Sequence, residues 1–198
     1  MFVYEKKLQY PVRIKNSNPK LAAAIISQYG GPDGELGASL RYLSQRYSMP
    51  YPGLKGMLTD IGTEELGHLE MVGTIVHQLT RNLTEQQIKD AGFEAYFVDH
   101  TTGVFPQFAS GYPWSAATMQ VTGDTIADLT EDLAAEQKAR VTYDNILRLS
   151  DDPDVTDAIR FLRAREIVHF QRFGEGLRLV KDRLGEKNVY YMNPSFDQ

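Results

Sequence analysis

Apolar residues recur every three or four positions along most of this chain, and few stretches show the alternation of a half-buried strand. This pattern predicts an all-α protein. A short helix is expected to begin at Pro19 and to be interrupted by Gly30, Gly31 and Pro32. The longer helical stretches cover residues 33–47, 54–80, 124–149 and 153–184.

Residues that start or stop helices separate these stretches. Two prolines in residues 48–53 prevent that segment from being helical, so it is predicted to be a short turn. Asp152 is expected to cap the last helix, with Pro153 at its first position. Gly185 is predicted to end it. Short turns make their flanking helices antiparallel neighbours.

One connection is much longer than the others. Thr84 can cap a short helix that ends near Gly92. Residues 92–123, which are rich in glycine, proline and aromatic residues, are then predicted to form a long crossover. Two antiparallel helix pairs joined by one long crossover make a ferritin-like four-helix bundle.

Length and composition narrow the class of protein. The 198 residues suit one domain, with an extended N-terminal segment (1–18) and a short C-terminal tail (185–198). The absence of cysteine excludes disulfides, thiolate catalysis and thiolate-bound metals, and the net charge of −5 does not favour a nucleic-acid partner. No apolar run approaches the roughly 20 residues of a membrane span, and no signal-peptide core is visible. We therefore expect an intracellular protein without a membrane span.

Two short motifs place a glutamate and a histidine on the apolar face of a helix. They are Glu65-Leu66-Gly67-His68 and Glu166-Ile167-Val168-His169. Residues three apart share a helix face, so each pair points at the core. A buried carboxylate without a partner costs several kcal/mol. These motifs therefore predict a bound cation in the core.

Both motifs belong to an internal repeat with an offset of 101 residues. Glu35 and Glu136 precede the motif glutamates by 30 residues in each half. The residues that follow them also repeat: Ala38 and Tyr42, Ala139 and Tyr143. Two helix pairs related by an approximate two-fold bring four glutamates and two histidines together, as in di-iron and di-manganese carboxylate proteins. Oxygen-rich ligation with one imidazole per metal favours manganese or iron.

Several segments together resemble the manganese catalases: Glu35, residues 65–68, residues 128–140 and residues 165–169. The opening residues 4–11 resemble in particular the spore-coat branch of that family. The resemblance covers nearly the whole chain. It implies a dimanganese catalase that converts hydrogen peroxide to water and oxygen, assembled as a hexamer. It also implies a place in the mother-cell cytoplasm and spore coat, with other coat proteins as partners.

The resemblance also implies roles for the site residues. The implied ligands of the two manganese ions are Glu35, Glu65, His68, Glu136 and His169. Glu65 would bridge the metals and take part in catalysis. Glu166 would lie outside the ligand set as the catalytic proton acceptor.

The two repeated tyrosines fit two alternative structural roles. Tyr42 and Tyr143 lie two turns beyond Glu35 and Glu136. They are expected either to hydrogen-bond these carboxylates and orient them, or to pack as ordinary core residues.

Other polar residues are expected outside the site. Glu64 and Glu131 fall off the apolar stripes, and His77 and His100 have no glutamate at the right spacing, so all four are predicted at the surface. Ala135 stands where some family members have arginine, which alters the charge near the metals. Two alternatives therefore stay open: an iron-binding ferritin-like oxidase, and a structural spore-coat component with a residual metal site.

Overall fold

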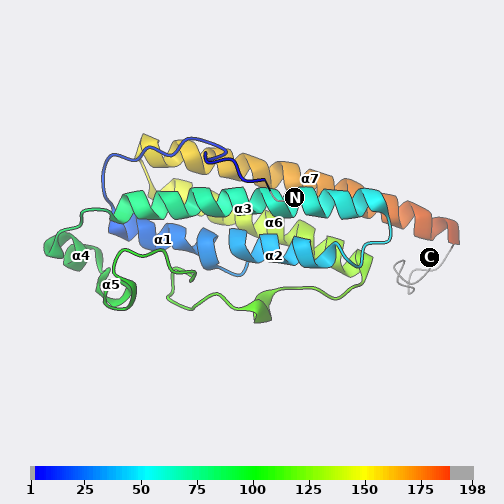
Figure 1. Cartoon of the computed structure of the whole chain (residues 1–198), viewed down its shortest axis with the longest axis horizontal. Coiled ribbons are helices and arrows are strands. Elements are labelled where there is room, and N and C mark those ends of the chain that lie inside the picture. Colours follow the sequence, from blue (N-terminus) through cyan, green and yellow to red (C-terminus); the bar gives the residue numbers. More distant parts are fainter. Residues whose placement is uncertain (1–2, 188–198) are drawn as a thin grey trace.

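The computed structural model describes residues 3–187, and within these residues it is helical and contains no strand, only an isolated bridge between Gln107 and Pro113. The bundle is made of α1 (Pro19–Gly30), α2 (Glu35–Gln45), α3 (Pro52–Thr80), α6 (Thr125–Leu149) and α7 (Pro153–Lys187). Helices α1 and α2 lie end to end along α3, and α6 packs along α7 (Figure 1). The prediction of an all-α four-helix bundle is confirmed.

The break between α1 and α2 determines where Glu35 lies. Helix α1 ends at Gly30, and α2 begins only at Glu35, two residues later than the predicted start at Asp33. A Cβ atom on Gly30 would lie 2.3 Å from the backbone nitrogen of Gln107, so the crossover packs directly against the break. Glu35 thus occupies the first turn of a helix whose N-terminus faces the middle of the bundle.

The crossover contains more regular structure than predicted. Thr84 and Gln87 form a capping box for α4 (Glu85–Ala91), which ends at Gly92 with a left-handed φ of 66°. Helix α5 (Glu94–His100) and the 3₁₀ turn η1 (Ala116–Thr118) follow within the segment expected to be irregular. Helix α5 has only seven residues and none of them is buried, so no long apolar stripe marks it in the sequence.

The predicted starts of α6 and α7 hold, but the predicted end of α7 is wrong. Asp124 accepts a hydrogen bond at the start of α6, and Asp152 accepts one from the backbone nitrogen of Asp154 at the start of α7. Gly185 does not end α7, which runs to Lys187. Glycine inside a helix costs only about 1 kcal/mol, and it does not by itself stop one. The remaining tail residues 188–198 lie outside the described part of the chain.

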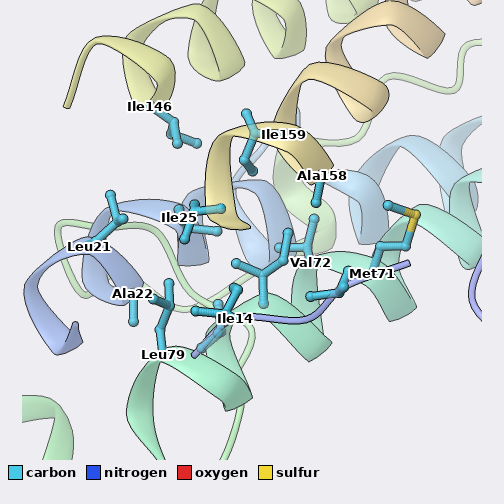
Figure 2. Packing of buried hydrophobic residues seen from close by; sticks show 14 of the residues in the cluster. Ile14, Leu21, Ala22, Ile25, Met71, Val72, Leu79, Ile146, Ala158 and Ile159 are labelled. Atoms are coloured by element: carbon cyan, nitrogen blue, oxygen red, sulfur yellow. The ribbon is translucent and has the colours of Figure 1, made fainter. Parts of the chain in front are cut away.

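Two apolar clusters fill the bundle, one on each side of its middle. Figure 2 shows the first, in which residues such as Ile14, Ile25, Val72 and Ile159 pack together from four segments of the chain. The second cluster lies toward the other end and includes Leu54, Leu58, Ile61, Leu129 and Phe173. Along α3, α6 and α7 a short polar stretch separates the two clusters, and this stretch contains the repeated glutamates and histidines.

The N-terminal segment lies across the outside of α3 and α7 (Figure 1). Tyr4 donates a hydrogen bond to Glu70 on α3, and Tyr10 donates one to Asp157 on α7. Over its described residues, 3–18, the predicted N-terminal segment forms neither helix nor strand and contains several bends. Among the described helices, none is long and apolar enough to cross a membrane.

Candidate metal centre

Six titratable side chains from four helices meet in the middle of the bundle. They are Glu35 of α2, Glu65 and His68 of α3, Glu136 of α6, and Glu166 and His169 of α7. Each is at most 2% exposed. The structure therefore brings together all six residues that the repeat singled out.

The six residues form two overlapping groups that could each hold a metal ion. One group is Glu35, Glu65, His68 and Glu166, and the other is Glu65, Glu136, Glu166 and His169. Within each group the nearest ligand atoms lie within 4.8 Å of one another. Glu65 and Glu166 belong to both groups, so both lie between the two positions.

Unpaired atoms at the centre fit a metal better than a network of hydrogen bonds. Among the described residues, Glu65 Oε1, Glu136 Oε2, Glu166 Oε1 and His169 Nδ1 find no hydrogen-bond partner. His169 Nδ1 approaches Glu65 Oε1 to 2.8 Å but not in a direction that makes a hydrogen bond. Buried polar atoms are rarely left unpaired, and lone pairs that converge in this way suit a shared cation.

Glu64 is not a surface residue, contrary to the prediction. Its Oε2 lies 3.0 Å from His169 Nε2, and its Oε1 lies 3.5 Å from His68 Nε2. Both imidazoles thus turn Nε2 toward Glu64 and Nδ1 toward the centre. A carboxylate on the outer nitrogen fixes the tautomer and ring orientation of a metal-binding histidine. Here a single carboxylate hydrogen-bonds His169 and lies close to Nε2 of His68 without a hydrogen bond to it.

Arg165 and Gln9 hold Glu64 in this position. Arg165 donates two hydrogen bonds to the Glu64 carboxylate, at 2.7 and 3.2 Å, and Gln9 of the N-terminal segment donates a third at 2.7 Å. Although burial raises the pKa of Glu64, hydrogen bonds from His169, His68 and Arg165 hold it well below its usual range. Glu64 is therefore ionised at any physiological pH.

The prediction for Glu64 was wrong because the apolar stripe of α3 shows only which face of α3 is buried in the core. It does not show which residues of other helices lie beside the remaining faces. A signal that could have found it was present, since Glu64 and Arg165 occupy equivalent positions of the repeat, 101 residues apart, with opposite charge. Glu131, by contrast, is partly exposed and pairs with Lys138 at 3.3 Å.

The two tyrosines bind the carboxylates crosswise. Tyr42 of α2 donates a hydrogen bond of 2.5 Å to Glu136 Oε1 of α6, and Tyr143 of α6 donates one to Glu35 Oε1 of α2. Each tyrosine therefore contacts the glutamate of the other half of the repeat rather than the one on its own helix. Both rings are fully buried, so they also pack in the core.

The metal-free centre holds extra protons on its histidines. Burial lowers the pKa of His68, but the carboxylates of Glu65, Glu64 and Glu35 raise it to about 10. Burial likewise opposes the carboxylates around His169, which raise its pKa to about 12. Both rings are protonated at neutral pH when no metal is present, and both must lose a proton to bind one.

The carboxylates of the centre divide into two kinds. Burial raises the pKa of Glu35, Glu136 and Glu166. Repulsion from Glu65 adds to this effect in all three, and Glu166 is also repelled by Glu136 and Glu35. Burial also acts on Glu65, but the two histidines outweigh it and lower its pKa. Glu65 thus stays ionised between the histidines, whereas Glu166 is disposed to take up a proton.

The remaining sequence candidates do not belong to either ligand group. His77 is exposed on α3, as predicted. His100 is only partly at the surface, because its ring stacks on Phe105 at 4.0 Å between centroids. Ala135 is 2% exposed, next to Glu136 on α6.

Comparison with known proteins identifies the family. The family model for manganese containing catalase matches residues 1–192, so the chain belongs to the manganese catalase family. Protein CotJC of Bacillus subtilis (strain 168) is 52% identical over 190 residues, which cover 96% of this chain and 100% of that protein. A probable manganese catalase of Clostridium acetobutylicum is 37% identical over 191 residues, which cover 95% of this chain and 84% of that protein.

Solved structures agree with this assignment. KatB, a manganese catalase from Anabaena PCC7120, superposes with a TM-score of 0.85 at 34% identity, covering 91% of this chain and 81% of KatB. A dodecameric thioferritin from Bacteroides fragilis matches with a TM-score of 0.56 at 15% identity, covering 87% of this chain and 90% of that one. The second match concerns the fold alone, and it agrees with the predicted ferritin-like bundle.

Proposed function

We propose that this protein is a dimanganese catalase that binds two manganese ions per chain and disproportionates hydrogen peroxide. The observation that carries this proposal is the pair of overlapping ligand groups, which share Glu65 and Glu166. Two positions that share a carboxylate hold their metals close enough to act on one small substrate. The bound pair of ions would supply the two-electron redox chemistry.

In this proposal Glu35 and His68 would hold one ion, Glu136 and His169 would hold the other, and Glu65, which belongs to both ligand groups, would serve both. Four glutamates balance the charge of two divalent cations, so the loaded core is close to neutral. Glu64 would orient the His169 imidazole through its hydrogen bond and attract that of His68 at 3.5 Å, with Nδ1 of each ring aimed inward. The hydrogen bonds from Tyr42 and Tyr143 would hold the carboxylates of Glu136 and Glu35 in position for the ions.

Glu166 is the proposed catalytic base. In the reaction, two molecules of hydrogen peroxide give one molecule of oxygen and two of water, so one peroxide gives up two protons that the other takes up. Glu166 is buried, has an unpaired Oε1, and has a pKa raised by burial and by Glu136, Glu35 and Glu65. A carboxyl group whose pKa lies nearer neutrality accepts and returns a proton more readily at physiological pH.

Oxygen release by manganese-loaded protein tests the proposal. We expect Glu65→Ala to abolish release and Glu166→Gln to lower it by 100-fold or more while manganese stays bound, because general base catalysis contributes about 10²–10⁴-fold. Glu85→Ala, at an exposed residue of α4, is the matched control and should leave the rate unchanged. Metal-loaded wild-type protein that releases no oxygen would overturn the proposal, and ferroxidase activity of iron-loaded protein would then point to the oxidase alternative.

We also propose an association with the spore coat. The 52% identity to Protein CotJC, together with the sequence resemblance to the spore-coat branch, supports a place in the mother-cell cytoplasm and coat with coat proteins as partners. Antibody labelling of sporulating cells tests it, and absence of the protein from the purified coat fraction would contradict it. An inactive but metal-loaded protein in the coat would favour the structural alternative.

We also propose that the protein assembles as a homo-oligomer of six chains. Val3, Tyr4 and Leu66 are exposed apolar side chains among the mixed polar and apolar residues that line a cavity of about 860 Å³ between the N-terminal segment and α3. Exposed apolar side chains near one another support a contact surface there. Light scattering coupled to gel filtration should give the mass of six chains, and a monomeric mass would contradict this part of the proposal.

A further inference from the structure

The two ligand groups differ in the residues that they do not share. The group that contains Glu136 and His169 has these two residues to itself. Among the described residues, Glu136 Oε2 and His169 Nδ1 have no hydrogen-bond partner. His169 Nδ1 lies 3.6 Å from Glu136 Oε2 and 2.8 Å from Glu65 Oε1, which is also unpaired. Three potential ligand atoms on this side are therefore already close together and free to bind an ion.

The other group has Glu35 and His68 to itself, and both of these residues are already engaged. His68 Nδ1 donates a hydrogen bond of 2.6 Å to Glu65 Oε2. Glu35 accepts a hydrogen bond from Tyr143, and neither of its carboxylate oxygens is both buried and unpaired. An ion on this side must therefore replace the bond between His68 and Glu65 before it can bind Nδ1. No such bond has to be replaced at His169.

Glu64 treats the two imidazoles differently from outside the centre. Its Oε2 accepts a hydrogen bond of 3.0 Å from His169 Nε2. Its Oε1 already accepts hydrogen bonds from Gln9 and from Arg165 Nε, each of 2.7 Å. This second oxygen lies 3.5 Å from His68 Nε2, which is buried and has no hydrogen-bond partner among the described residues. Because an outer hydrogen bond orients a ligating histidine and raises its basicity, only His169 is prepared for an ion in this way.

The tyrosine contacts do not distinguish the two sides. Glu35 and Glu136 are equivalent positions of the repeat, and each accepts a hydrogen bond from a tyrosine of the other half. The outer contacts do distinguish them, because the repeat has Glu64 in one half and Arg165 in the other. The difference between the two histidines therefore follows from the one pair of unlike residues beside them.

We propose that the two metal positions fill in a fixed order, first on the His169 side and then on the His68 side. The first ion would take the free atoms of Glu136 and His169, and the second would enter only when His68 releases Glu65. Glu64 is a positioning residue in this order, since it acts through the histidine ring that it hydrogen-bonds. The order rests on the two-metal site of the proposed function, but not on peroxide turnover.

The position of the first ion tests the order directly. The metal-free full chain is loaded with one manganese ion per chain and crystallised, and anomalous diffraction at the manganese edge locates the ion. We expect a peak between Glu136 and His169 with about ten times the occupancy of any peak between Glu35 and His68, or more. Equal occupancy at both positions, or a stronger peak on the His68 side, would overturn the order.

Two matched variants test the order in solution. Unequal binding constants alone would not suffice, because the first divalent cation repels the second at either position. His68→Ala and His169→Ala change equivalent positions of the repeat, and electron paramagnetic resonance of unbound manganese gives both constants. We expect His169→Ala to lower the first constant by about tenfold or more and His68→Ala to change it by less than about threefold. Similar losses in the two variants would overturn the order.

A third variant tests whether Glu64 causes the order. We expect Glu64→Gln to lower the first constant by about 10–100-fold and the second by less than about threefold, so that the two positions fill more evenly. Glu131→Gln, at the partly exposed glutamate of α6, is the control and should keep both constants. A Glu64→Gln protein that still fills the His169 side first, with an unchanged first constant, would overturn the role of Glu64.

Failure of the order and failure of the proposed catalase give different results. Ordered filling of a protein that releases no oxygen would contradict the catalase and support the order. Even filling of a protein that releases oxygen would support the catalase and overturn the order. If a histidine variant fails to fold, diffraction from the wild-type chain with one manganese ion still decides between the two positions.

Discussion

Glu64 and Arg165 are equivalent positions of the 101-residue repeat, and they bind each other through two hydrogen bonds on the approximate two-fold axis. Identical residues at such positions would place two like charges side by side. The chain instead has a carboxylate in one half and a guanidinium in the other. This difference lets one carboxylate contact the outer nitrogens of both His68 and His169.

Removal of the Glu64 charge should weaken metal binding. We expect Glu64→Gln to lower manganese affinity by about 10–100-fold, the usual effect of losing the outer partner of a metal-binding histidine. Competition with a fluorescent chelator measures it. Glu131→Gln, at the partly exposed glutamate of α6, is the matched control. Equal affinities for the two variants would show that Glu64 does not orient the histidines.

Manganese binding should release protons and should tighten as pH rises. Below pKa values of about 10 and 12, His68 and His169 carry protons in the metal-free protein. A metal must displace these protons, so a fall in pH favours the metal-free form. Calorimetry in two buffers of different ionisation enthalpy counts the protons released at pH 7. Zero release, or affinity independent of pH between 6 and 8, would contradict the charges assigned to the centre.

Loss of either crosswise tyrosine hydroxyl should destabilise the protein. Tyr42→Phe and Tyr143→Phe each leave a buried carboxylate without its donor, which costs about 1–3 kcal/mol. Tyr47→Phe, at an exposed ring, should change the free energy of unfolding by less than about 0.5 kcal/mol. Urea unfolding of the three variants compares them. If the buried variants unfold like Tyr47→Phe, these hydroxyls do not support the carboxylates.

The break before α2 should tolerate no added side chain. Gly30→Ala would bring its Cβ within 2.3 Å of the Gln107 backbone nitrogen, so we expect a loss of about 1–3 kcal/mol or more. Gly53→Ala has nothing within 4 Å of the new Cβ, and should leave stability unchanged or raise it slightly. Thermal unfolding distinguishes the two. A Gly30→Ala protein as stable as the wild type would mean that the crossover does not pack on the break.

Most of the bundle was predictable because its signals are local. The caps predicted at Thr84 and Asp152 each depend on a few neighbouring residues, and both hold. The helix end predicted at Gly185 was wrong, because a glycine allows a helix to end but does not make it end there. Helix α5 was missed because it buries little against the bundle.

The centre was predictable because the chain repeats itself. An offset shared by Glu65, His68 and their counterparts brings residues from distant helices together without knowledge of the packing. The repeat could not indicate contacts made by residues that differ between its two halves. Glu64 depends on an opposite charge from another helix, and no spacing along one helix reports such a partner.

Anomalous diffraction at the manganese edge, from crystals of the manganese-loaded protein, tests the central claim most directly. We predict two peaks per chain, one between Glu35 and His68 and one between Glu136 and His169, with Glu65 contacting both. A single peak, or peaks elsewhere on the chain, would contradict the dinuclear centre.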